Sequence, residues 1–152
     1  MKKKAFAILG STGSIGKSSL NVIKKLKDTK VELIFADKNF KEILKQIRIY
    51  KPRIVVVNTI ETFIKLKNIF KKKIKILNDY KESKKYLKKI DTTISAIPGI
   101  NGLEPTIFFT EISKKVLIAN KESVICGWNL ITKIAKKFNT KLIPIDSEHF
   151  SI

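Results

Sequence analysis

The sequence predicts an α/β fold with a mostly parallel sheet and helices on both of its faces. Short runs rich in β-branched residues alternate along the chain with longer segments whose apolar residues recur every three or four positions. This alternation is typical of strands joined by amphipathic helices in a parallel sheet. The 152 residues, 43% of them hydrophobic, suffice for a single packed core.

The strands are expected at the short apolar runs. They are predicted over residues 5–9, 31–36, 54–57, 73–77, 92–96, 116–119 and 142–145. Pro52 is expected to end the second helix just before the third strand. Pro105 suits the first turn of a later helix, where its missing N–H does no harm.

The helices are expected between these runs, and two of them have clear apolar stripes. The first stripe consists of Ser19, Val22, Ile23 and Leu26, and the last of Val124, Trp128, Ile131, Ala135 and Phe138. Each stripe repeats at helical spacing, so we expect it to pack its helix onto the sheet.

The composition narrows the classes of function. The formal net charge of +19 would suit a polyanionic partner, but all but two of the 32 basic residues are lysines, and they are spread along the whole chain. Direct base readout relies on arginine, so nucleic-acid binding is disfavoured against solvated helix faces enriched in lysine. The single Cys126 and single His149 exclude an internal disulfide, a cysteine-based zinc cluster and a histidine-rich metal site.

The sequence also disfavours a membrane protein. No apolar run approaches the roughly 18 consecutive residues of a spanning helix. The apolar run near the N-terminus is too short for a signal peptide. We therefore expect a cytoplasmic protein without a membrane partner.

A glycine loop follows the first predicted strand and opens the first helix. Gly10, Gly13 and Gly16 are spaced Gly-x-x-Gly-x-x-Gly, not Gly-x-Gly-x-x-Gly, and the spacing does not fit a P-loop. Glycine lets the backbone turn sharply and approach a pyrophosphate, while the helix N-terminus offers free N–H groups. Strand, loop and helix together favour a Rossmann-like dinucleotide site over a merely structural turn.

The end of the second predicted strand leaves the choice of dinucleotide open. Asp37 stands near the position where a carboxylate accepts hydrogen bonds from the ribose 2′-OH of NAD. Lys38 and Asn39 offer donors that suit the 2′-phosphate of NADP. These residues alone do not decide between the two cofactors.

Three further segments follow strands on the side where ligands bind in open parallel sheets: residues 96–106, 118–123 and 143–149. On an extended backbone, Asp146 and Glu148 point to one side, and Ser147 and His149 to the other. Two carboxylates on one side could begin a site for a hard cation, although such a pair is more often a solvated strand end.

Taken in order, these motifs resemble the 1-deoxy-D-xylulose 5-phosphate reductoisomerase family, the NADPH- and metal-dependent enzymes of the non-mevalonate isoprenoid pathway. The motifs are ILGSTGSIG at residues 8–16, the turn at 96–106, IANKES at 118–123 and PIDSEH at 144–149. The resemblance spans essentially the whole chain, and the motifs are specific in combination.

The resemblance implies a set of site residues. NADPH would be held by Gly10, Thr12, Gly13, Ser14, Ile15, Asp37, Lys38, Asn39, Asn120 and Glu122. The sugar phosphate would contact Lys121, Ser147 and Glu148, and Mg²⁺ or Mn²⁺ would be bound by Asp146 and Glu148. Lys121, Glu148 and His149 would be the catalytic residues. The chain departs from the family at Asp37, where glycine is usual, and at Pro98 and Asn101, which replace small apolar residues.

Family members are much longer than this chain, which implies a division at residue 145. We expect residues 1–145 to form the NADPH-binding domain and residues 146–152 to begin the catalytic domain, whose remainder is absent. The resemblance implies that the full-length protein is a homodimer and that this chain alone is inactive. The alternative is a nucleotide- or nucleic-acid-binding module without turnover.

Overall fold

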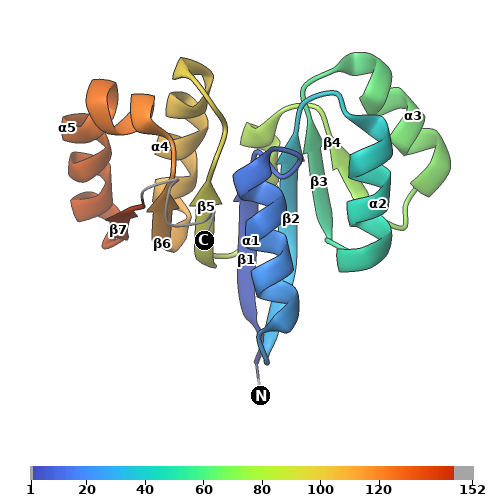
Figure 1. Cartoon of the computed structure of the whole chain (residues 1–152), viewed down its shortest axis with the longest axis horizontal. Helices are drawn as coiled ribbons and strands as arrows, with labels where there is room; N and C mark the ends of the chain where they lie inside the picture. Colours follow the sequence, from blue (N-terminus) through green and yellow to red (C-terminus); the bar gives the residue numbers. More distant parts are fainter. Residues whose placement is uncertain (1, 146–152) are drawn as a thin grey trace.

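The strands form one parallel sheet in the order β4-β3-β2-β1-β5-β6-β7 in the computed structural model, which describes residues 2–145 (Figure 1). They are β1 (Lys4–Leu9), β2 (Thr29–Ala36), β3 (Ile54–Val57), β4 (Lys75–Leu77), β5 (Ile90–Ser95), β6 (Ser113–Ile118) and β7 (Lys141–Pro144). All neighbouring pairs within this sheet are parallel. The predicted fold class is confirmed.

Several strand bounds differ from the predicted ones. β2 and β6 begin earlier, at Thr29 and Ser113, because polar residues that carry no apolar signal pair with neighbouring strands there. β5 also begins earlier, at the buried Ile90, which pairs with Ser113 although the polar Asp91 follows it. β4 begins later than predicted, because Lys73 is part of a turn in which its N–H donates to the Phe70 carbonyl at 2.9 Å.

Helices cover both faces of the sheet. They are α1 (Ser14–Lys25), α2 (Phe40–Tyr50), α3 (Ile60–Phe70), α4 (Leu103–Glu111) and α5 (Lys121–Phe138), with short 3₁₀ helices η1 (Tyr80–Lys85) and η2 (Ile100–Gly102). The first three pack on one face, and α4 and α5 pack on the other. Within residues 2–145, no helix is both long and apolar enough to cross a membrane.

Alternating side chains of the central strands form two separate cores. Ile8, Ile34 and Val55 face α1, α2 and α3, while Leu9, Phe35 and Val56 face the opposite layer, which includes Phe109 of α4. This arrangement follows from the period of two along a strand, and it explains why these strands read as continuous apolar runs.

Pro52 and Pro105 lie where the sequence predicted. α2 ends at Tyr50, its C-cap Lys51 has a left-handed backbone with φ 48°, and Pro52 follows directly. Pro105 lies in the first turn of α4. Each proline thereby avoids a position where a backbone N–H would be needed for helix hydrogen bonding.

The order of the strands reverses at β1: β2, β3 and β4 follow one another on one side of it, and β5, β6 and β7 on the other. The loop after β1 leads to α1 on one face, and the loop after β5 leads to α4 on the other. Ligands of open parallel sheets bind at such a switch point, beyond the carboxyl ends of the strands.

Candidate functional site

A cavity of about 330 Å³ lies at the carboxyl ends of the central strands. It is lined by Gly10, Thr12, Gly13, Phe35, Ala36, Asp37, Asn58, Ile97, Pro98 and Asn101. The structure thus brings together four of the predicted cofactor residues, Gly10, Thr12, Gly13 and Asp37. They come from the loops after β1 and β2, which lie far apart in the sequence and side by side in the sheet.

Gly10 and Gly16 allow the glycine loop to pack closely on neighbouring backbone. The N–H groups of Gly10 and Ser11 both donate to the Phe35 carbonyl, at 2.8 and 3.1 Å. Gly10 has a φ of +83°, and a Cβ there would lie 2.6 Å from the carbonyl oxygen of Ala96. A Cβ on Gly16 would overlap the carbonyl oxygen of Gly10. Neither position can hold a side chain without moving the loop.

Gly13 has a different role. It is the N-cap of α1, its φ of −77° is open to any residue, and an added Cβ would meet only the Gly10 carbonyl oxygen, at 3.6 Å. No side chain caps α1, and no acidic residue occupies its first turn. The free N–H groups of that turn and the positive end of the helix dipole therefore face the solvent beside the exposed Gly13, which suits a phosphate.

Asp37, Lys38 and Asn39, which directly follow β2, are exposed. Asp37 accepts a hydrogen bond from the Thr59 hydroxyl at 3.4 Å. Asn39 caps α2 by accepting from the Glu42 N–H at 3.2 Å, so its amide nitrogen remains available. Lys38 and Asn39 do not line the cavity but follow Asp37, which does.

Phe35, which lines the cavity, belongs to a cluster of aromatic side chains. Phe35 lines it and stacks on Tyr80, with ring centroids 5.6 Å apart, and Tyr80 meets Phe108 edge-on at 5.4 Å. Burial, followed by the charge of Glu104, raises the pKa of the Tyr80 hydroxyl. The hydroxyl therefore stays neutral at physiological pH, and the packed rings support Phe35 from behind.

The turn after β6 holds Asn120, Lys121 and Glu122, and none of the three lines the cavity. Asn120 is only 3% exposed, whereas Lys121 and Glu122 are exposed in the first turn of α5. The Asn120 side chain donates to two carbonyls of the loop after β5, and that loop lines the cavity. Asn120 thus contacts the loop that lines the cavity and not the cavity itself.

The predicted metal and catalytic residues Asp146, Ser147, Glu148 and His149 lie outside the described residues. The chain approaches them at Ile145, whose N–H donates to the Ile118 carbonyl at 2.9 Å. Among residues 2–145, no group of three or more His, Cys, Asp or Glu side chains is arranged to hold a metal ion.

Sequence reasoning missed Asn58, Gln46 and Asn78. Asn58 lines the cavity, Gln46 donates to the Ser11 carbonyl at 2.8 Å, and Asn78 donates to the carbonyls of Val57 and Asn58. A polar residue on a helix or after an edge strand usually faces solvent. Only the packing of elements distant in sequence shows that Asn58 lines the cavity and that the amides of Gln46 and Asn78 hold loops of the site.

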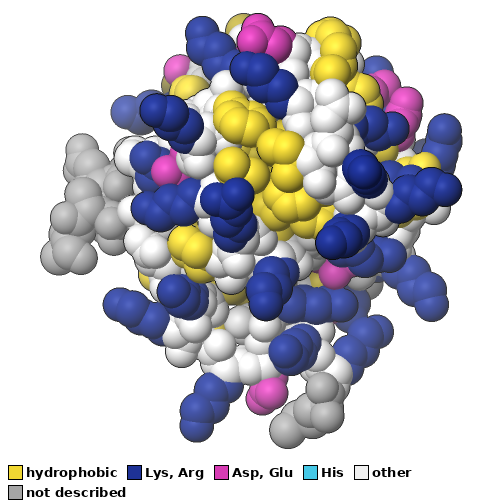
Figure 2. Space-filling view, turned by 90° about the vertical axis from the view of Figure 1, so that its right-hand side faces the viewer, with side chains coloured by type: hydrophobic (Ala, Val, Ile, Leu, Met, Phe, Trp, Pro, Cys, Tyr) yellow, Lys and Arg dark blue, Asp and Glu magenta, His cyan; other side chains and the backbone are white. Residues whose placement is uncertain are grey.

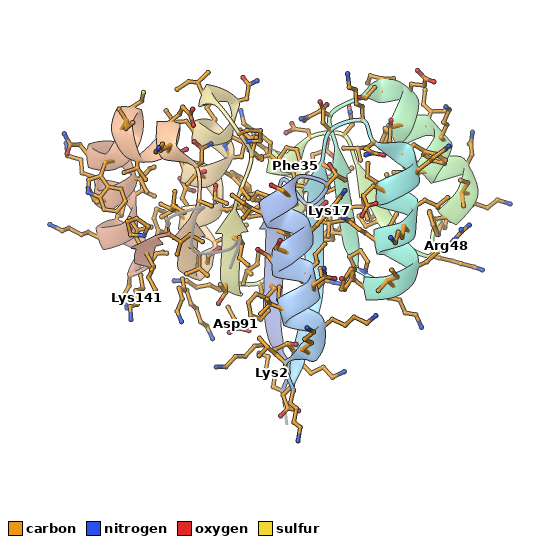
Figure 3. All side chains as sticks on the ribbon, viewed as in Figure 1. Lys2, Lys17, Phe35, Arg48, Asp91 and Lys141 are labelled. Atoms are coloured by element: carbon orange, nitrogen blue, oxygen red, sulfur yellow. The ribbon has the colours of Figure 1, made fainter. Side chains whose placement is uncertain are left out.

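A larger cavity, of about 400 Å³, lies at the amino ends of the strands, where Figure 3 shows Lys2 and Asp91 far from Phe35. Its two carboxylates are already paired, Glu32 with Lys30 and Arg53, and Asp91 with Lys114. This end of the sheet has neither a glycine loop nor a helix N-terminus in its lining. We therefore place the functional site in the smaller cavity.

The basic side chains are dispersed on the face of the molecule that Figure 2 presents. Figure 2 shows lysines and arginines scattered around an apolar patch on the face that it presents. On this face the charge does not form one continuous stripe, which is the typical feature of a surface that binds a nucleic-acid backbone.

Comparison with known proteins identifies relatives of this chain. A family model described as 1-deoxy-D-xylulose 5-phosphate reductoisomerase matches residues 6–127. The reductoisomerase of that name from Pelagibacter ubique is 44% identical over 154 residues, which cover 98% of this chain and 40% of the relative. The one from Francisella tularensis is 37% identical over 152 residues, which cover 99% of this chain and 40% of the relative. The chain thus spans about 40% of the length of these curated relatives.

Solved structures of the same enzyme share the fold. The reductoisomerase from Zymomonas mobilis in complex with NADPH is 27% identical and superposes with a TM-score of 0.84, covering 97% of this chain and 40% of that one. A reductoisomerase in complex with NADPH, fosmidomycin and magnesium is 28% identical, with a TM-score of 0.85 over 96% of this chain and 37% of that one.

Proposed function

Because the chain belongs to the 1-deoxy-D-xylulose 5-phosphate reductoisomerase family, we propose that it is the NADPH-binding part of such an enzyme. The complete protein would rearrange and reduce 1-deoxy-D-xylulose 5-phosphate to 2-C-methyl-D-erythritol 4-phosphate. The observation that carries the proposal is the cavity beside Gly13, where the uncapped first turn of α1 meets the ends of β1, β2 and β5.

The residues present fit a dinucleotide. Gly13, Ser14 and Ile15 would hold the pyrophosphate with the free N–H groups of the first turn of α1. The absence of acidic residues from that turn avoids repulsion of the phosphates. Gly10 and Thr12 would border the cofactor from the loop after β1.

The adenosine end would lie over the end of β2. Lys38 and the free amide nitrogen of Asn39 are exposed there and can donate to a 2′-phosphate. The negative charge of Asp37 would repel that phosphate and lower the affinity for NADPH, and its carboxylate supplies no hydrogen-bond donor. We propose that NADPH is nevertheless preferred, as its presence in the solved relatives supports.

NADPH supplies a hydride when bound, and the protein positions it against the substrate. The exposed Lys121, in the first turn of α5, would bind the sugar phosphate together with Ser147, and Glu122 would border the cofactor beside it. Lys121, Glu148 and His149 would be the catalytic residues.

A divalent cation, Mg²⁺ or Mn²⁺, would be bound by Asp146 and Glu148, whose carboxylates suit a hard cation. The magnesium in a solved relative supports this proposal. Two carboxylates are fewer than the six or more oxygen ligands that such a cation takes, so further ligands must come from elsewhere.

We further propose that residues 1–145 form the cofactor domain and that the catalytic domain begins at residue 146. The complete protein would work in the cytoplasm as a homodimer. The exposed free thiol of Cys126 suits a reducing compartment.

The experiment is calorimetric titration of the chain with NADPH, with NADH and with a short DNA duplex, each at low and high salt. We expect saturable NADPH binding. If the chain binds DNA but neither dinucleotide, and the DNA affinity falls steeply with salt, the result would instead support the nucleic-acid-binding alternative.

A further inference from the structure

The loops that line the cavity are held from outside by side-chain amides. The loop after β1 is held by Gln46, the loop after β3 by Asn78, and the loop after β5 by Asn120. Each amide comes from a different element, α2 for Gln46, the segment after β4 for Asn78 and the N-cap of α5 for Asn120. In each case the amide nitrogen donates to backbone carbonyl oxygens.

Both the nitrogen and the oxygen of the Asn120 side-chain amide form hydrogen bonds within the protein. Its Nδ2 donates to the carbonyl oxygens of Ile97 and Gly99, the latter at 2.9 Å, and its Oδ1 accepts from the Ser123 N–H at 3.0 Å. A Cβ on Gly102 would overlap Nδ2, so the adjoining turn leaves just enough room for this amide. Both amide protons are used within the protein, and neither is left for a cofactor.

Asn78 and Gln46 act in the same way on the other two loops. Asn78 Nδ2 donates to the carbonyls of Val57 at 2.9 Å and Asn58 at 3.1 Å. Gln46 is 2% exposed, and its Nε2 donates to the Ser11 carbonyl at 2.8 Å. In a trans peptide the N–H lies opposite the carbonyl, so this bond leaves the Thr12 N–H pointing away from Gln46.

We propose that Gln46, Asn78 and Asn120 are positioning residues that fix the peptide planes of the three loops before the cofactor binds. The inference rests on the proposed function of the cavity. A carbonyl that lost its donor could rotate toward the cavity, where its oxygen would repel a phosphate. A loop fixed in advance loses less conformational entropy on binding.

The test replaces each amide by the acid of the same shape: Asn120→Asp, Asn78→Asp and Gln46→Glu. A carboxylate cannot donate and faces the carbonyl oxygens with a negative charge, whereas the protonated acid regains one donor. The matched control is Asn129→Asp, which adds the same charge at an exposed site on α5. The ligand is NADP⁺, which we would titrate by calorimetry at about pH 8 and at about pH 5.5, either side of the range over which a buried carboxyl titrates.

We expect Asn120→Asp to weaken NADP⁺ binding at least about tenfold at the higher pH. At the lower pH its affinity should rise, and by a larger factor than any change in the affinity of the parent chain. Asn129→Asp should follow the parent chain at both pH values. A purely structural role would lower the melting temperature without this pH-dependent change in affinity.

The possible results distinguish a failure of this inference from a failure of the proposed function. If the parent chain does not bind NADP⁺, the proposed function fails. If the parent chain binds and the folded Asn120→Asp and Asn78→Asp chains bind equally well at both pH values, the positioning role is wrong. Should Asn120→Asp fail to fold, Asn78→Asp and Gln46→Glu decide, and failure of all three to fold would show that the amides serve folding itself.

Discussion

The three glycines of the loop after β1 serve different physical purposes. Gly10 and Gly16 are required by backbone contacts, whereas Gly13 has an ordinary φ of −77° and room for a side chain. The fold therefore does not require glycine at Gly13, and its absence of a side chain leaves the N-terminus of α1 accessible.

We expect Gly13→Val to leave the fold intact and to weaken NADPH binding by about 100-fold or more, about 2.8 kcal/mol, because the side chain would occupy the space of the pyrophosphate. Circular dichroism and calorimetric titration measure the two effects. Gly16→Val is the control: its Cβ would overlap the Gly10 carbonyl, so this chain should lose stability as well. Unchanged NADPH affinity in folded Gly13→Val would place the phosphates elsewhere.

Asp37 lines the cavity next to Lys38 and Asn39, and we expect it to reduce the preference of the chain for NADPH over NADH. We expect NADPH to bind more tightly than NADH, and Asp37→Gly to widen the difference by about fivefold to tenfold, since removal of one like charge near the surface is worth about 1 kcal/mol. The hydrogen bond from Thr59 is lost with the carboxylate, so Thr59→Val controls for it. Equal affinity of the parent chain for both cofactors would show that Asp37 outweighs Lys38 and Asn39.

At the scale of elements, Asp91 joins the starts of β1 and β5. Its Oδ2 accepts the Ala5 N–H at 2.8 Å and its Oδ1 lies 3.1 Å from Lys114 Nζ. The hydrogen bond from the Ala5 backbone, and then the hydrogen bond and charge of Lys114, lower the pKa of this carboxyl below its usual value, although burial opposes them. The ionised carboxylate therefore stabilises the contact between the two strands.

Asp91→Asn should reduce the free energy of unfolding by about 1 kcal/mol at neutral pH. Because the pKa is lower in the folded state, the stabilisation is present above the unfolded pKa and is lost as the pH falls through the folded pKa. Urea unfolding at about pH 7 and at about pH 2.5 should show the difference between the two chains shrinking at the lower pH. Glu61→Gln, which breaks the exposed pair with Lys65, should change little at either pH.

At the scale of the whole molecule, the chain has the cavity for a cofactor but spans about 40% of its curated relatives. We expect the 152-residue chain to bind NADPH without turning over 1-deoxy-D-xylulose 5-phosphate. A substrate exposed to water would lack the electrostatic stabilisation of a closed site, and two carboxylates hold a hard cation weakly. The assay is substrate-dependent oxidation of NADPH with Mg²⁺ or Mn²⁺ present, and turnover by this chain alone would contradict the expectation.

In a protein extended to the length of the relatives, Asp146→Asn and Glu148→Gln should each remove most of the activity. Both should spare NADPH affinity, because they alter metal binding and not the glycine loop. Full activity of either variant would contradict the metal assignment, and loss of NADPH affinity would contradict the separation of the two sites.

The sequence by itself determined the fold class, the approximate strands and the family, because these depend on local signals: apolar period, glycine spacing and contiguous motifs such as IANKES. Gly10 and Asp37 were recognisable in this way, each from its place at a strand end. Only the tertiary structure decided which loops meet in one cavity, that Gly13 is unconstrained by its backbone and that the Asn120 side chain donates hydrogen bonds to the loop after β5. These properties depend on hydrogen bonds and packing between residues distant in the chain, and no local pattern encodes them.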